Sequence, residues 1–152
     1  MSRPKIIAAN WKMNLSISEG MKLAEDVHKY AQLHVAGTPM KVILCPPFTH
    51  LSQVAWVLKE SEVKLGAQDC HFEPNGAFTG DVSAAMVAGA GCQYCIVGHS
   101  ERRQNHHEAN RIVNAKLLAV LRNNMTPILC IGETADEKRN GKTNEVLAKQ
   151  MQ

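Results

Sequence analysis

The chain has 152 residues and a mass of 16.7 kDa, which is close to the length of one domain and disfavours two. Apolar residues make up 45% of it and charged residues 20%, so it has enough apolar surface for a core and is not a disordered chain. The formal charge of +3, from 17 basic and 14 acidic residues, is too small to indicate binding to nucleic acid or to a membrane surface.

Targeting and redox signals point to the same compartment. No apolar run approaches the ~18 residues of a membrane span, and the first residues do not resemble a secretory signal. Five cysteines, an odd number without the spacing of a disulfide framework, indicate free thiols in a reducing environment. We therefore expect a cytoplasmic globular protein in which residues 1–152 form one domain.

Short apolar runs typical of buried strands alternate with segments of helical periodicity. In chain order the sequence predicts strand 5–9, helix 18–32, strand 41–45, a helix after Thr49, strand 63–68, helix 83–90, strand 94–97, helix 105–123, strand 127–131 and a helix from 143. Ser16 and Glu19 have the spacing of a capping box, and Thr49 is the expected N-cap of the second helix. Residues 69–81 are aperiodic and predict one long loop. The alternation predicts an α/β fold, a parallel sheet covered by helices.

Asn10 and Lys12 directly follow the first predicted strand. Ligands of parallel α/β proteins bind at the carboxyl ends of the strands, so this amide and this ammonium are candidate ligand contacts. Taken alone, Lys12 favours a solvated lysine over a functional one, because lysine is seldom buried.

The fourth predicted strand ends at the turn Gly98-His99, and Ser100 and Glu101 suit the first turn of a helix. This places His99 beside backbone N–H groups, where an uncharged imidazole can donate a hydrogen bond to a developing oxyanion. The alternatives are a structural histidine and, for the charged residues 101–103, a solvated ion cluster.

Four separated segments together resemble the triosephosphate isomerase family. They are residues 10–14 (NWKMN), 66–70 with 76–81 (GAQDC and GAFTGD), 98–103 (GHSERR), and 127–134 with 141–143 (PILCIGET and GKT). The segments occur in the order of the family and the resemblance extends along the whole chain.

The resemblance implies a (β/α)8 TIM barrel, of which this chain holds strands one to five with their helices. It implies interconversion of dihydroxyacetone phosphate and D-glyceraldehyde 3-phosphate through an enediolate, a step of glycolysis and gluconeogenesis. The family uses neither a cofactor nor a metal for this reaction and usually forms homodimers.

The resemblance also implies roles for particular residues. Asn10 and Lys12 match substrate-binding positions, and Lys12 faces the charge of the phosphate and the enediolate. His99 matches the catalytic electrophile. Glu101 matches an acid beside Lys12, and Ser100 matches a residue that contacts the catalytic region.

A loop that joins two subunits is implied as well. Thr79, next to Phe78, matches the loop tip that enters the partner subunit beside Asn14 and His99 of that subunit. Asp69 and Asp81 depart mildly from the family, which commonly has asparagine and glutamate there.

The glutamate base of the family and its later phosphate-binding loops have no counterpart in these 152 residues. We therefore expect the chain by itself to be inactive. The alternative function is a non-catalytic half-barrel fragment or interaction module, because a half barrel leaves two strand edges unpaired. A zinc site at Cys92 and Cys95 is disfavoured, since a second cysteine or histidine pair at matching spacing is missing.

Overall fold

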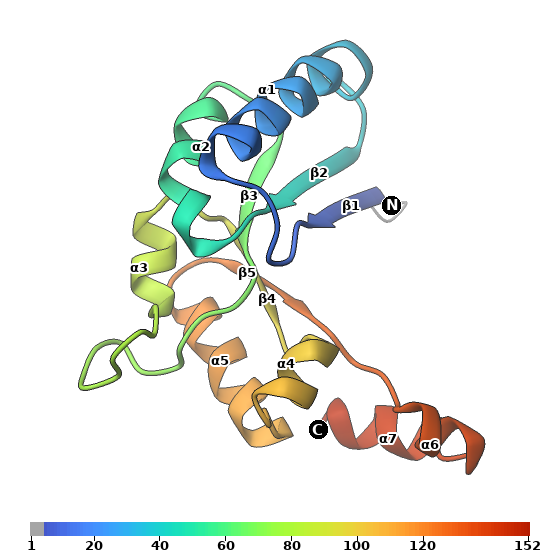
Figure 1. Ribbon diagram of the computed structural model, residues 1–152. Coiled ribbons are helices and arrows are strands. Elements are labelled where there is room, and N and C mark those ends of the chain that lie inside the picture. Colours follow the sequence, from blue (N-terminus) through green and yellow to red (C-terminus); the bar gives the residue numbers. More distant parts are fainter. Residues whose placement is uncertain (1–4) are drawn as a thin grey trace.

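The computed structural model describes residues 5–152 and contains five parallel strands that lie side by side in chain order (Figure 1). The strands are β1 (Lys5–Asn10), β2 (Met40–Cys45), β3 (Lys64–Ala67), β4 (Tyr94–Val97) and β5 (Thr126–Leu129). Each strand pairs in parallel with the next one along the chain, as Asn10 of β1 does with Cys45 of β2. The predicted α/β fold is confirmed, as an open sheet of successive βα units.

Helices follow the strands, and four of them contribute buried residues to the core on one face of the sheet (Figure 1). They are α1 (Ile17–His34), the 3-10 turn η1 (Phe48–His50), α2 (Leu51–Val57), α3 (Ala84–Gly89), α4 (Ser100–Asn105), α5 (Asn110–Arg122), α6 (Ala135–Arg139) and α7 (Thr143–Gln150). Within residues 5–152, no helix has the length and apolarity needed to cross a membrane.

The cap predicted for α1 is confirmed. The Ser16 hydroxyl accepts a hydrogen bond from the Glu19 backbone N–H at 3.4 Å, and the Glu19 carboxylate accepts one from the Ser16 N–H at 2.8 Å. The prediction for Thr49 is wrong. Thr49 lies inside η1, because the chain turns directly after Pro47, and His50 takes the N-cap position of α2 without a side-chain cap.

The helix predicted over 105–123 begins later than predicted: α5 starts at Asn110, and Asn105 is the last residue of a separate helix, α4. The break lies at His107, whose φ of +55° is left-handed, and at Glu108, whose side chain turns into the protein and is 5% exposed. A continuous amphipathic helix would require Glu108 to follow the helical path, but its carboxylate pairs with buried cations instead. The chain becomes helical again after Ala109, which has extended backbone.

Alternate residues of each strand face opposite sides of the sheet. Leu44 of β2 and Val97 of β4 belong to the core between sheet and helices. Ile43, Cys45 and Ile96 form a smaller cluster on the other face. β2 and β4 are therefore apolar on both faces, as the uninterrupted apolar run Val42–Cys45 predicted for β2.

The two edge strands are less covered than the central ones. Ile6 and Ile7 of β1 are 54% and 53% exposed, whereas Ile43 of the neighbouring strand is fully buried. The loop between β3 and α3 extends away from the sheet (Figure 1) and contains an isolated bridge between His71 and Ser83. The long loop predicted over 69–81 is thus present.

Candidate active site at the carboxyl ends of the strands

A cleft of about 580 Å³ lies where β1, β3 and β4 end. Its walls include the polar side chains of Asn10, Lys12, Asn14, Gln68, Asp69, His99, Glu101 and Arg102. Three separate βα connections therefore contribute polar groups to one space, the arrangement expected at the carboxyl edge of a parallel sheet.

Lys12 lies in a constrained loop after β1. Its φ of +54° is left-handed, which is unusual for a residue with a side chain. The Asn10 carboxamide oxygen accepts a hydrogen bond from the Lys12 N–H at 2.9 Å. The Gln68 side chain donates to the carbonyls of Lys12 and Cys45, each at 2.8 Å. Gln68 thus ties the β1 loop to the end of β2.

The Lys12 ammonium meets a carboxylate from the other side of the cleft. Its Nζ lies 2.6 Å from Glu101 Oε1, and the two side chains are 53% and 46% exposed. The hydrogen bond from Lys12 holds the pKa of the Glu101 carboxyl below its ordinary value of 4.5, and the positive charge of Lys12 acts in the same direction. The cation is therefore fixed in direction while it stays accessible from the cleft.

His99 is the N-cap residue of α4. Its Nδ1 accepts a hydrogen bond from the Glu101 backbone N–H at 3.3 Å. A ring nitrogen that accepts a hydrogen bond carries no proton, so Nε2 is the nitrogen that can donate. Ser100 and Glu101 open the helix as the sequence predicted.

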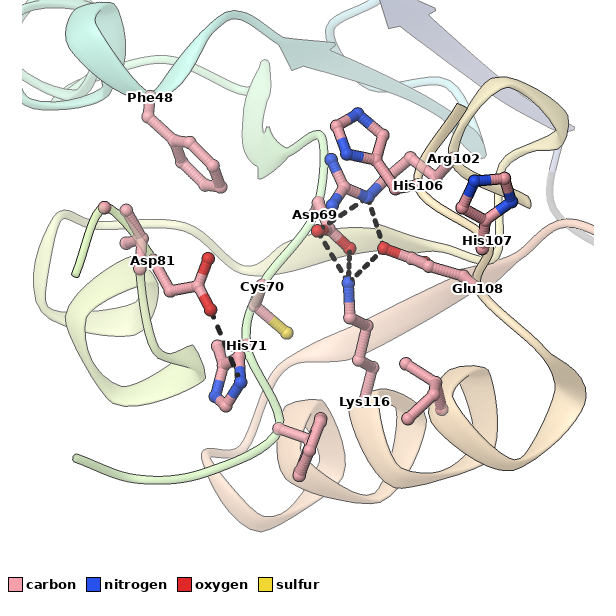
Figure 2. A pocket seen from close by; sticks show the side chains of 14 residues that line it. Phe48, Asp69, Cys70, His71, Asp81, Arg102, His106, His107, Glu108 and Lys116 are labelled. Carbon is pink, nitrogen blue, oxygen red and sulfur yellow. Dashed lines mark hydrogen bonds and ion pairs between the residues drawn. The ribbon is translucent and has the colours of Figure 1, made fainter. Parts of the chain in front are cut away.

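A second cavity of about 480 Å³ lies behind the β3 end and contains a buried ion network (Figure 2). Lys116 of α5 pairs with Asp69 at 2.7 Å and with Glu108 at 2.6 Å. Arg102 of α4 contacts the same two carboxylates, at 2.8 and 2.6 Å. Two carboxylates and two cations thus join β3, α4, α5 and the segment between these helices.

The pKa values of the two carboxyl groups in this network are shifted in opposite directions. Burial raises the pKa of Asp69 above its ordinary 3.8, and the pairing with Lys116 offsets only part of this shift. Burial also favours the neutral form of Glu108, but hydrogen bonds from Lys116 and Arg102 outweigh it and lower the pKa of this carboxyl. Arg102 is therefore part of a buried network and not of a solvated ion cluster.

The structure brings most of the predicted site residues together. Asn10, Lys12, Asn14, His99 and Glu101 all line the cleft at the strand ends. Other predicted residues lie elsewhere: Ser100 is exposed on the first turn of α4, and Phe78 and Thr79 lie on the extended loop before α3.

Sequence reasoning missed Gln68 and Lys116 as site residues. Gln68 gives no signal of its own, because its two acceptors are backbone carbonyls 56 and 23 residues away. Lys116 does give a signal, since it shares one helical face with the buried Val113, Ala119 and Val120. A lysine on such a face requires a carboxylate partner.

The cysteines belong to the core. Cys92 and Cys95 are both buried between sheet and helices, and burial raises the pKa of the Cys92 thiol to about 12. In the part of the chain that the structure describes, no three metal-ligating side chains are grouped to hold an ion.

A parallel sheet of successive βα units, with polar side chains gathered over its carboxyl edge, defines a protein of the β/α-barrel class. The family model of triosephosphate isomerase matches residues 5–152. The chain belongs to the triosephosphate isomerase family.

Individual relatives agree with this assignment. The triosephosphate isomerases of Clostridium tetani and Clostridium novyi are 45% and 46% identical over 149 residues, which is 98% of this chain and 57% and 58% of theirs. The crystal structure of triosephosphate isomerase from Bartonella henselae superposes with a TM-score of 0.87 and is 36% identical. That match covers 98% of this chain and 60% of the other. The chain thus spans somewhat more than half the length of the relatives it matches.

Proposed function

We propose that this chain supplies the first five βα units of a triosephosphate isomerase, which interconverts dihydroxyacetone phosphate and D-glyceraldehyde 3-phosphate. The observation that carries the proposal is the meeting of Lys12 and His99 in one cleft at the ends of β1 and β4. The proposed reaction moves a proton between two adjacent carbons through an enediolate and uses no cofactor.

Four polar side chains of the cleft, those of Asn10, Lys12, His99 and Glu101, have a part in this reaction. The Lys12 ammonium binds the substrate phosphate and stabilises the negative enediolate, and Asn10 assists binding. His99 donates a hydrogen bond from Nε2 to the enediolate oxygen. Donors that are already in place where charge develops stabilise the transition state strongly. Glu101 acts through Lys12, whose ammonium it holds at 2.6 Å, and Ser100 supports the turn as the first residue of α4.

We assign the general base to the βα units beyond these five. The carboxylates that line the cleft are Glu101 and Asp69. Glu101 is paired with Lys12, and Asp69 is paired with Lys116 and Arg102. A base must be free to take the substrate proton, so neither carboxylate suits this step.

The proposed active form is a cytoplasmic homodimer. Phe78 is 43% exposed, and it and the exposed Thr79 lie on a loop that extends from the sheet, which suits docking into a second copy. The five cysteines are free thiols, as a reducing compartment favours.

The test uses a completed chain. We define it as the natural continuation of this sequence or, in its place, residues 1–152 joined to the part of the Clostridium tetani relative beyond the match. We expect isomerase activity, and we expect His99→Asn to lower kcat by about 10²–10³-fold, the effect of removing one oxyanion donor. His107→Asn is the matched control, because asparagine tolerates the left-handed φ of +55° at that position.

A completed chain that folds but has no isomerase activity would overturn the proposal. That outcome would favour the alternative, a half barrel that binds a partner through its exposed edge at Ile6 and Ile7.

A further inference from the structure

Arg103 directs its guanidinium group toward the turn that carries His99. Its Nε donates a hydrogen bond to the Gly98 carbonyl at 2.8 Å. Its Nη1 donates to the Asn110 side chain at 2.8 Å, and its Nη2 reaches the Cys130 carbonyl at 3.5 Å. One side chain on α4 therefore connects the end of β4, the start of α5 and the segment after β5.

The contacts of Arg103 differ in kind from those of its neighbour. Arg102 forms ion pairs with Asp69 and Glu108. Among residues 5–152, no carboxylate oxygen lies within 4.0 Å of the Arg103 guanidinium, whose three contacts are all neutral oxygen atoms. Its role is therefore to hold backbone and amide groups in place rather than to neutralise charge.

The carbonyl that Arg103 contacts belongs to Gly98, a residue whose backbone has little conformational restraint of its own. Gly98 has a left-handed φ of +71°, and a Cβ there would lie 2.7 Å from Val113 and 3.1 Å from Arg103 Nη2. Glycine is thus required, and glycine restrains the backbone least. The peptide unit between Gly98 and His99 is planar, so fixing its oxygen fixes the orientation in which the chain enters His99.

We propose that Arg103 is a positioning residue of the isomerase reaction, which fixes the backbone that carries the His99 ring by holding the Gly98 carbonyl. This inference rests on the proposed function, in which His99 Nε2 donates to the enediolate oxygen. The rest of the His99 environment agrees with it, because His99 Nδ1 is fixed separately by the Glu101 N–H. Arg103 fixes the backbone position of His99, and the Glu101 N–H fixes the orientation of its ring.

Arginine is needed for this geometry. Its planar fork donates in three directions at once, whereas the lysine ammonium is a single point charge on a flexible stem. Arg103→Lys therefore keeps the charge but not the set of three contacts. In the completed chain we expect it to lower kcat by about 10- to 100-fold, since displacing a catalytic group by about 1 Å has effects of this size. KM should change by less than about twofold.

The decisive measurement is a double-mutant cycle with His99→Ala. If Arg103 acts through His99, Arg103→Lys should change kcat by less than about twofold once the imidazole is gone. A purely structural role would lower kcat by the same factor in both backgrounds, and that result would overturn the inference. So would an unchanged kcat for Arg103→Lys alone. Arg111→Lys, at an exposed position of α5, is the matched control and should leave kcat unchanged.

A second variant covers the case in which Arg103→Lys fails to fold. Asn110→Ala removes one acceptor and leaves Arg103 in place, so it should lower kcat by a smaller factor, again only when His99 is present. An equal loss with and without His99, or no loss, contradicts the inference. Lack of activity in the folded completed chain without substitutions overturns the proposed function first, and this inference with it.

Discussion

At the scale of residues, Lys12 carries a cationic side chain on a backbone in an unfavourable, left-handed conformation. A left-handed φ costs a residue with a side chain about 1–3 kcal/mol. The contacts of Asn10 and Gln68 with the Lys12 backbone offset this cost, and Glu101 directs the ammonium. Three residues, one from each of three βα connections, thus act on one charged residue.

The pairing of Lys12 with Glu101 predicts a pH dependence. The hydrogen bond from Lys12 lowers the pKa of Glu101 below 4.5 in the folded protein, so the pair is complete above 4.5 and is lost as the pH falls through the lowered pKa. In the completed chain, Lys12→Met should move the pKa of Glu101 back up toward 4.5, measured by ¹³C NMR titration of its carboxyl.

Glu19 provides the internal control for that titration. Its pKa is lowered by the hydrogen bonds with Ser16 and should not respond to Lys12→Met. An unchanged pKa of Glu101 in the variant would show that Lys12 does not hold this carboxylate in solution.

The sequence predicted the location of those site residues that come directly after a strand. Asn10, Lys12 and His99 lie just beyond apolar strands, and this alone predicted the edge of the sheet at which they meet. The ion pair of Lys116 with Asp69 was not predicted, because it joins residues 47 positions apart and depends on how α5 packs against β3.

At the scale of elements, the strands were the most predictable part of the chain. The strand Tyr94–Val97 has the predicted bounds, and the other four overlap their predicted ranges. In β2, β4 and β5, apolar residues face both sides of the sheet, which gives an uninterrupted apolar run. The helical boundary at His106 was not predictable from periodicity. Glu108 leaves the helical path for a buried ion pair, which is a tertiary contact.

The loop between β3 and α3 provides a prediction about assembly. Thr79→Arg in the completed chain places a charge at the exposed end of this loop, and docking into a second copy would have to bury that charge. We expect a weaker dimer in sedimentation equilibrium and a lower activity at low protein concentration.

Ser52→Arg, at an exposed position of α2, is the comparison variant and should sediment like the unsubstituted protein. A Thr79→Arg protein with undiminished dimer affinity would refute the role assigned to the loop.

At the scale of the whole molecule, the five strands within residues 5–152 form an open sheet with two edges. A closed barrel pairs every strand on both sides, whereas here β1 and β5 each pair with one neighbour. Uncovering a few hundred Å² of apolar surface costs several kcal/mol at ~25 cal/mol per Å². This is comparable with the ~5–15 kcal/mol stability of a typical domain.

Residues 1–152 alone should therefore self-associate or unfold without a sharp transition, while keeping part of their helical circular dichroism. The measurement is thermal unfolding together with analytical ultracentrifugation, and the completed chain serves as the control. A sharp cooperative melt from a monomer with dispersed amide resonances would instead establish the five-stranded unit as an independent fold.

The most direct test of the account is the isomerase activity of two purified proteins, residues 1–152 alone and the completed chain. We expect turnover in the ordinary range of about 1–10³ s⁻¹ for the completed chain. We expect none above background for residues 1–152, because the described residues that line the cleft include Lys12 and His99 but no free carboxylate base. Turnover of glyceraldehyde 3-phosphate at enzyme rates by residues 1–152, free of host isomerase, would contradict it.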